Sequence, residues 1–338
     1  MSKQGGRKVI KKQFVVLCCL AVILGVIPNG LHAKEVVLKL ASWGPAKHFV
    51  AEARAVWIEE VNQALAGRYK IVDYPGGQLY GPSDIHKAVA KGTVDMGVVL
   101  QPAMLAMVPM VQGVYLPFAF DSIEQVAAAY SGESLEIIER AMEKKRLKLI
   151  YVSYLDPVQI FSNKGNITQI EDFNGLRVLS SSPIFTEIMA ELGAAPDTSI
   201  PQTEWYMALK RSVSDSMANS VVGGFFQKSF EVAPYITKMN MSYPTILVCM
   251  NLKKWEKLPE DVRATLLDLG KKQGDHTLAM SKGWEHKFTG ALTKAGATVS
   301  TLAPEEREKI VGVARNVWAQ WAGKNGKEAE RLLKLSVK

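Results

Sequence analysis

Apolar residues follow two alternating patterns along the chain. Short runs rich in apolar and β-branched residues predict strands at Val36–Ala41, Tyr69–Tyr74, Met96–Leu100, Lys148–Ser153 and Pro244–Asn251. Apolar residues at helical spacing predict helices at His48–Ala64, Asp84–Lys91 and Pro183–Leu192, and over most of Asp121–Lys145. Because strands alternate with helices, we expect a mixed α/β fold.

The longest helical pattern begins at Pro259 and extends to about Ala295. Proline suits a first helical turn, because its missing N–H would have no partner within the helix there. Glycines at 270, 274, 283 and 290 would allow bends along this helix. The last predicted helix, Pro304–Gly323, carries apolar residues on one face.

The first 33 residues have the pattern of a secretory signal peptide. Basic residues without an acidic one precede the apolar run Phe14–Ile27, which is short for a membrane-spanning helix, and Leu31–Ala33 resembles a cleavage site. An uncleaved N-terminal anchor is the alternative. A lipid anchor is not favoured, because Cys18 and Cys19 lack the preceding small residue of a lipoprotein signal. We therefore predict an exported, periplasmic protein.

Removal of this segment changes the charge of the chain. Loss of its basic residues lowers the formal net charge from +8 to +3. A net charge of +3 is ordinary for a protein surface, so we predict no nucleic-acid partner. Cys249 is then the one remaining cysteine, so we expect a buried structural thiol and no intramolecular disulfide. Roughly 300 residues remain, enough for two lobes.

Several short motifs occur in a fixed order over about 250 residues. They include Pro75–Gly81, Lys91–Gly97, Leu116–Phe120 and the segment from Asn251 to Pro259. The central stretch, residues 170–220, contributes Asp172, Gly175, Leu176, Arg177, Val178, Glu204, Tyr206, Ala208, Leu209, Val213, Asp215 and Asn219. At these positions the chain resembles the solute-binding proteins of TRAP transporters, the DctP-like family.

This resemblance implies an α/β, two-lobed periplasmic-binding-protein fold with a long helix bracing both lobes. The expected division is a signal peptide at 1–33, lobe I at 34–155 plus 246–284, and lobe II at 156–245 plus 285–338. The protein would be a monomer that binds one small molecule in the cleft between the lobes and closes by a hinge. It would deliver that molecule to the membrane subunits of a TRAP permease driven by an ion gradient.

Leu179 stands where most family members have an arginine that binds the carboxylate of the ligand. A second family arginine precedes the segment that matches Ser162–Lys164, but Pro157–Ile160 contains no cation. A carboxylate without a cationic partner costs several kcal/mol in an apolar cleft. We therefore predict a ligand that is neutral or largely apolar.

Asn219 is the first candidate for ligand binding, because the matching family asparagine hydrogen-bonds the ligand and an amide both donates and accepts. The other candidates are Leu179, Trp43, Phe226, Phe118, Trp205 and Arg177. Core packing is the default interpretation of the aromatic residues, although their apolar area would suit such a ligand. The alternative ligand, an organic acid, would need a cation such as Arg177, Lys47 or His48.

Motifs for catalysis are not found. The sequence contains no G-x-S-x-G, H-E-x-x-H, C-x-x-C or P-loop pattern, and after residue 33 no two histidines are four residues apart. We therefore predict no cofactor and no metal, and an exported enzyme is disfavoured. A sensory ligand-binding protein without a transport role is the other alternative.

Overall fold

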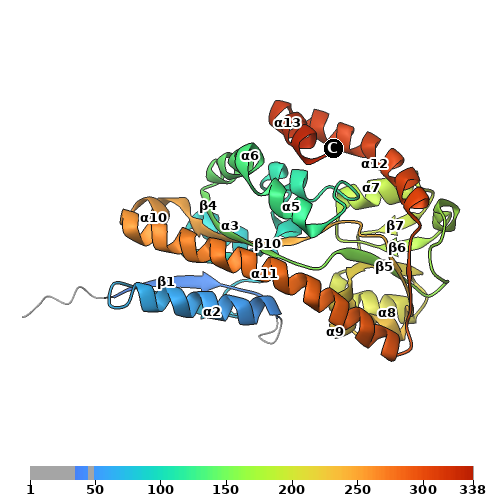
Figure 1. Cartoon of the computed structure of the whole chain (residues 1–338), viewed down its shortest axis with the longest axis horizontal. Helices are drawn as coiled ribbons and strands as arrows, with labels where there is room; N and C mark the ends of the chain where they lie inside the picture. The colour runs from blue at the N-terminus through green and yellow to red at the C-terminus, as the bar shows by residue number, and fades with distance from the viewer. Residues whose placement is uncertain (1–34, 45–48, 338) are drawn as a thin grey trace, which may run out of the picture.

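The computed structural model describes residues 35–44 and 49–337. The predicted signal peptide, Lys47 and His48 lie outside these ranges. No helix in the described part of the chain is long and apolar enough to cross a membrane. The chain forms two β-sheets with helices packed against them, which confirms the predicted α/β class (Figure 1).

The first sheet has five strands in the order β2-β1-β3-β10-β4. These strands are β1 (Val36–Ala41), β2 (Tyr69–Tyr74), β3 (Met96–Leu100), β4 (Leu147–Tyr154) and β10 (Thr245–Asn251). β1 is parallel to β2 and β3, whereas β10 is antiparallel to β3 and β4. The apolar runs in the sequence therefore predicted all five strands to within one residue.

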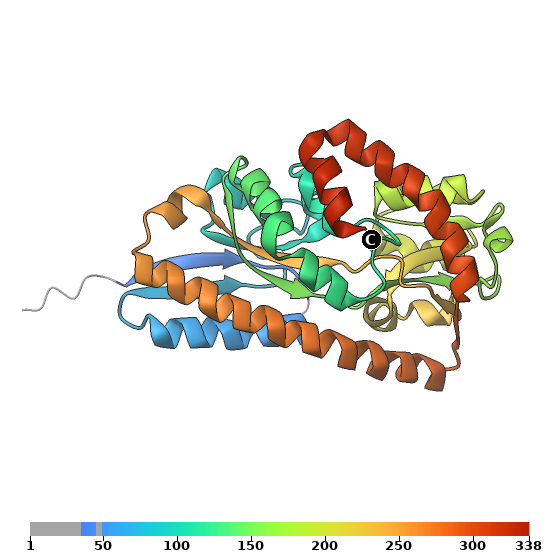
Figure 2. The ribbon, with the colours of Figure 1, turned by 45° about the horizontal axis from the view of Figure 1, so that its top comes forward.

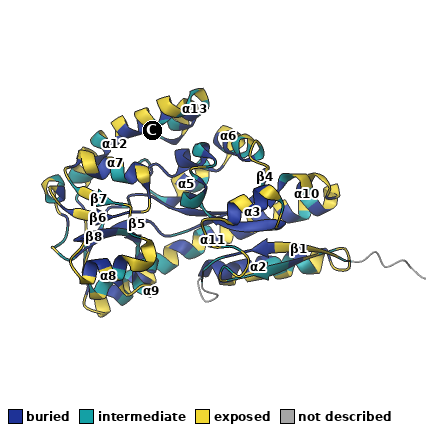
Figure 3. Ribbon diagram, turned by 180° about the vertical axis from the view of Figure 1, so that it is seen from behind, coloured by how far each residue is buried: buried dark blue, intermediate teal, exposed yellow. Residues whose placement is uncertain are grey.

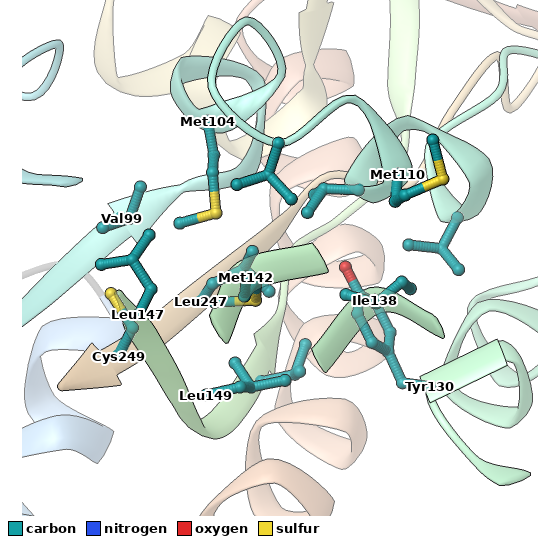
Figure 4. Close-up of a cluster of buried hydrophobic side chains, with 14 of the residues drawn as sticks. Val99, Met104, Met110, Tyr130, Ile138, Met142, Leu147, Leu149, Leu247 and Cys249 are labelled. Atoms are coloured by element: carbon teal, nitrogen blue, oxygen red, sulfur yellow. The ribbon is translucent and has the colours of Figure 1, made fainter. Parts of the chain in front are cut away.

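Both faces of this sheet are buried. The helices around it are α2 (Phe49–Ala64), α3 (Ile85–Lys91), α4 (Gln101–Met104), η1 (Pro109–Val114), α5 (Ile123–Ala129), α6 (Gly132–Glu143) and α10 (Leu252–Glu256). Along β10, Leu247 and Cys249 belong to one apolar cluster and Ile246 and Val248 to another, as expected for alternating side chains. Figure 4 shows Cys249 among the apolar side chains of the first cluster. The predicted buried thiol is confirmed, and burial raises its pKa to about 12.

The second sheet has six strands in the order β11-β9-β5-β8-β6-β7. They are β5 (Val158–Ser162), β6 (Arg177–Leu179), β7 (Ala195–Asp197), β8 (Ser216–Ser220), β9 (Tyr235–Lys238) and β11 (Thr298–Thr301). The helices of this part are η2 (Ile170–Phe173), α7 (Pro183–Glu191), η3 (Gln202–Glu204), α8 (Trp205–Lys210), α9 (Val221–Phe226) and η4 (Ser229–Glu231). Alternate residues again divide between two clusters, with Val178 in one and Leu179 in the other. Figure 3 shows the strands mostly buried and the outer helix faces exposed.

Two extended segments connect the sheets. Leu155 to Pro157 leads from β4 to β5, and Met239 to Pro244 leads from β9 to β10. The segments are hydrogen-bonded to each other, because the N–H of Leu155 donates to the Pro244 carbonyl at 3.2 Å and the N–H of Val158 to the Ser242 carbonyl at 2.8 Å. The two crossings therefore form one hydrogen-bonded unit.

Helix α11 (Glu260–Lys294) contacts α2 and β4 on one side of these crossings and α9 on the other (Figure 2). The predicted long brace is confirmed, and α11 is one continuous helix despite its glycines. Two of the glycines allow close approach instead: a Cβ at Gly274 would lie 2.9 Å from the Val152 carbonyl oxygen, and one at Gly270 would lie 3.1 Å from Cβ of Tyr151.

The C-terminal segment forms two helices, α12 (Pro304–Asn325) and α13 (Lys327–Ser336). α12 packs against α7, whereas α13 turns back and packs against η1 and α6 of the first sheet. The sequence did not predict α13, which follows Gly326 with its positive φ of 85°. The predicted lobe boundaries stay a prediction.

Candidate ligand-binding site

The first half of the candidate site follows β1. Trp43 and Gly44 border a cavity of about 30 Å³, which Arg54 and Val98 also line. The indole Nε1 of Trp43 is buried and has no hydrogen-bond partner among the described residues. Because an unpaired buried donor costs free energy, this N–H is suited to donate to a ligand.

Arg54 is a buried cation beside this cavity that the sequence analysis did not single out. Its Nε and Nη2 both donate to Oδ2 of Asp73, at 3.2 and 3.1 Å, and the Ser42 hydroxyl donates to Oδ1 of the same carboxylate at 2.6 Å. The Arg54 charge is therefore largely balanced by Asp73. A signal did exist in the sequence: Arg54 lies four residues after Val50 and three before Trp57, on the apolar face of the predicted helix.

The second half lies on β5 and β8, where Gln159 is directly opposite Asn219. The Asn219 amide donates to Oε1 of Gln227 at 2.9 Å, and its Oδ1 accepts the N–H of Ser220 at 2.9 Å. Gln159 is fully buried: Oε1 accepts the N–H groups of Met239 and Asn240, and Nε2 donates to the Asn240 side chain at 2.8 Å. Gln159 therefore holds the crossing, and Asn219 retains one amide hydrogen for a ligand.

Leu179 is 0 % exposed and belongs to a cluster with Phe161, Trp205 and Met217. The Trp205 indole donates to the Ile200 carbonyl at 2.9 Å, so its polar atom is satisfied within the core. Val222 and Ile236 are further buried apolar members of the same cluster. Leu179 therefore occupies an apolar core position in the second sheet.

Arg177 is held by Asp215 in a bidentate pair, with Nε–Oδ2 at 2.8 Å and Nη2–Oδ1 at 2.7 Å. Its Nη1 donates to the carbonyls of Ser212 and Val213. The hydrogen bonds from Arg177 hold the pKa of the Asp215 carboxyl below its usual value. The donors of Arg177 are thus engaged in joining β6 to the segment before β8.

The other two aromatic candidates lie apart from each other. Phe118 is buried in the cluster of Trp318, on the opposite face of the sheet from Leu179. Phe226 is 50 % exposed at the end of α9. The structure thus brings Leu179 and Trp205 together, and it places Phe118 in a separate part of the core.

A row of rings joins the two halves. Phe49 of α2 contacts Trp284 of α11 with ring centroids 4.9 Å apart, Trp284 contacts Phe288 at 5.2 Å, and Phe288 contacts Phe226 of α9 at 5.3 Å. The Lys287 ammonium lies 5.1 Å from the Trp284 ring centroid. The sequence did not indicate the contacts of Phe49, Trp284 and Phe288, because α2, α9 and α11 meet only in the folded chain.

Asp156 is a buried carboxyl in the first crossing. Its Oδ2 accepts the N–H of Val222 in the first turn of α9, at 2.9 Å. Burial raises the pKa of Asp156 to about 7, and the charge of Glu285 on α11 adds to this effect. Glu285 itself is paired with Lys238 at 2.7 Å. Asp156 therefore links the crossing to the helix that follows Asn219.

Gly224 lets α9 pack directly on the core. A Cβ at this position would lie 2.6 Å from Cε1 of the buried Phe161 ring. We expect Gly224→Ala to lower the free energy of unfolding by roughly 1–3 kcal/mol, because the ring has no free space into which to move. Urea unfolding at 25 °C measures the change.

Gly290→Ala in α11 is the matched control, since no atom lies within 4 Å of a Cβ there. This control should keep or raise the stability by up to about 1 kcal/mol. Equal stabilities of the two variants would contradict the close contact of Gly224 with Phe161.

Within residues 35–44 and 49–337, no group of three or more His, Cys, Asp or Glu side chains is arranged to hold a metal ion.

Two sheets joined by paired crossings and braced by one long helix define a two-lobed solute-binding protein. Comparison with known families agrees: the model of the DctP family, described as bacterial extracellular solute-binding protein, family 7, matches residues 40–325. The chain belongs to this family, whose members are solute-binding receptors rather than enzymes.

Curated relatives are similar over most of their length. The C4-dicarboxylate-binding periplasmic protein DctP of Rhodobacter capsulatus is 28% identical over 279 residues, which cover 80% of this chain and 82% of the relative. The protein of the same name from Vibrio cholerae is 25% identical over 289 residues, which cover 85% of this chain and 86% of the relative.

Solved structures show the same fold. A TRAP periplasmic solute-binding protein from Ochrobactrum anthropi, with its C-terminus bound in the ligand-binding pocket, superposes with a TM-score of 0.84 at 22% identity. The match covers 90% of this chain and 95% of that one. A second such protein, from Sulfitobacter sp. NAS-14.1 with bound β-D-galacturonate, has a TM-score of 0.80 at 21% identity. This match covers 88% of this chain and 98% of that one.

Proposed function

We propose that this protein is the periplasmic receptor of a TRAP transporter and that its ligand is a neutral or largely apolar small molecule. The receptor captures this molecule between its lobes as a monomer, closes by a hinge at the two crossings, and delivers it to an ion-gradient-driven permease. The observation that carries the choice of ligand is the complete burial of Leu179 in an apolar cluster.

Two further features support a ligand without a carboxylate. Gln159 uses its amide to hold the second crossing, and the nearby buried group is the acid Asp156 rather than a cation. Neither the protonated nor the ionised form of Asp156 offers a carboxylate a positive charge. At the end of the row of rings, Phe226 is 50 % exposed and offers apolar area, whereas Phe49 and Phe288 are buried.

One observation favours the alternative, an organic acid. Arg54 is buried and lines the cavity beside Trp43, and the relatives from Rhodobacter capsulatus and Vibrio cholerae are named for C4-dicarboxylates. Arg54 Nη2 lies 3.1 Å from Oδ2 of Asp73. An acid whose carboxylate reached this cavity of about 30 Å³ would therefore have to compete with Asp73 for the guanidinium. Because of this competition, Arg54 supports an organic acid less strongly than the burial of Leu179 supports a neutral or apolar ligand.

Thermal unfolding with a library of small molecules tests the receptor function. A ligand that binds only the folded protein raises the melting temperature, by an amount that grows with its concentration above the dissociation constant. We expect neutral and apolar compounds to give the largest shifts and C4-dicarboxylates to give none. A library in which no compound raises the melting temperature would contradict the receptor function.

Trp43→Phe tests the donor beside the cavity. Phenylalanine keeps the apolar ring but removes the unpaired N–H, so we expect the affinity for the ligand found in the library to fall about fivefold, equivalent to roughly 1 kcal/mol. Isothermal titration calorimetry measures the change.

Trp57→Phe is the matched control for this prediction. The Trp57 Nε1 is also buried without a partner among the described residues, but Trp57 packs against Tyr151 and does not line the cavity. Its replacement should leave the affinity unchanged. An equal loss in both variants would show that Trp43 has no specific role in binding.

A further inference from the structure

A second cavity, of about 430 Å³, lies between α12, the end of α13 and the junction of α5 with α6. Its apolar lining includes Phe118, Val311 and Trp318, which belong to the cluster on the opposite face of the second sheet from Leu179. Leu335 also lines the cavity and is 37% exposed. The cavity is therefore separate from the candidate site between the two sheets.

The cavity also contains hydrogen-bond donors that the fold leaves unused. Ser336 lines it and is 8% exposed, yet its hydroxyl has no partner among the described residues. The first turn of α6 borders the same space through Glu133 and Ser134. The preceding Ser131 donates its hydroxyl to the Ala128 carbonyl instead of capping this turn. Uncapped N–H groups at a helix start favour an acceptor or an anion.

Charged side chains around the cavity are already paired. Arg307 binds Asp121 at 2.9 Å and Arg315 binds Glu308 at 3.0 Å. The Glu133 carboxylate is held by Arg331 of α13. These pairs leave the lining close to neutral, so one anionic head group would meet no uncompensated carboxylate among them.

We propose that this cavity binds a small amphiphile with a carboxylate head and an apolar chain. The head accepts hydrogen bonds from the Ser336 hydroxyl and from the first turn of α6. The chain packs against Phe118, Val311 and Trp318. The N–H of Phe118 donates to the carbonyl of Met241, which belongs to the second crossing. A molecule packed against Phe118 therefore lies beside this crossing.

Octanoate is the probe, and calorimetric titration of the full mature protein is the measurement. We expect saturable one-site binding that is lost in Ala128→Trp, because Ala128 is an exposed lining residue of α5 whose enlargement fills the cavity without disturbing the core. Ser336→Ala should weaken binding about fivefold. Ser300→Ala, which removes another buried hydroxyl without a described partner, should leave binding unchanged.

Trp43→Phe separates this site from the candidate site between the sheets, and octanoate binding should persist in it. The octanoate titration therefore stays informative even if the candidate site between the sheets does not bind the ligand class proposed above. Absence of octanoate binding at millimolar concentration, or equal binding by wild type and Ala128→Trp, would overturn the proposal. Loss of octanoate binding in Trp43→Phe alone would overturn it as well.

Discussion

Replacing Leu179 with arginine is expected to lower the free energy of unfolding by roughly 3–5 kcal/mol and to abolish binding of the natural ligand. The leucine side chain is completely buried in an apolar cluster with Phe161, Trp205 and Met217. A guanidinium placed among these side chains would lose its hydration. Urea unfolding at 25 °C and calorimetric titration measure the two effects.

Leu179→Met is the matched control, because it conserves volume and polarity and should cost less than about 1.5 kcal/mol. The opposite result would be informative. If Leu179→Arg folds with wild-type stability and binds an organic acid more tightly than the wild type does, the position faces an acid-binding cleft. The proposed ligand class would then be wrong.

Asp156→Asn is expected to change how stability depends on pH. The pKa of Asp156 is about 7 in the folded protein, well above the ordinary value of 3.8. Between these values the folded state binds more protons than the unfolded state, so the contribution of Asp156 to stability falls as the pH rises. Asparagine stays neutral and still accepts the Val222 N–H. The variant should therefore gain stability relative to wild type, by about 4 kcal/mol between pH 4 and pH 8.

The measurement is urea unfolding of both proteins at several pH values, with the difference plotted against pH. Other carboxyls cancel in this difference, including Asp215, whose pKa is lowered by Arg177. Asp275→Asn, at an exposed residue of α11, serves as the control for the loss of one carboxyl from the surface. A flat difference for Asp156→Asn would show that its carboxyl is not desolvated in the crossing.

Much of the fold could be predicted from local patterns. The strands of the first sheet are continuous apolar runs because both of their faces are buried, and the long brace follows Pro259 as expected. Short strands such as β11 carry little pattern, and α9 contains two glycines that disfavour a helix in isolation. Contact of Gly224 with Phe161 explains why a glycine is present there, but this contact exists only in the tertiary structure.

The candidate site was predicted less completely than the fold. The position of Leu179 could be compared with the family pattern, because it lies in a motif-rich strand. The roles of Arg54 and Gln159 depend on partners distant in sequence, Asp73 and Asn240. The apolar helix face indicates that Arg54 is buried, but no local pattern reveals either partner. Asp156 has a raised pKa because its carboxyl is buried, which is likewise a property of the folded chain.

Native mass spectrometry of the receptor purified with its natural ligand tests the proposed ligand class most directly. The released molecule would be identified by its mass and fragmentation. We expect one neutral or largely apolar molecule per chain, held without a cation at position 179. A tightly bound dicarboxylate, with binding lost on replacing Arg54, would contradict this proposal.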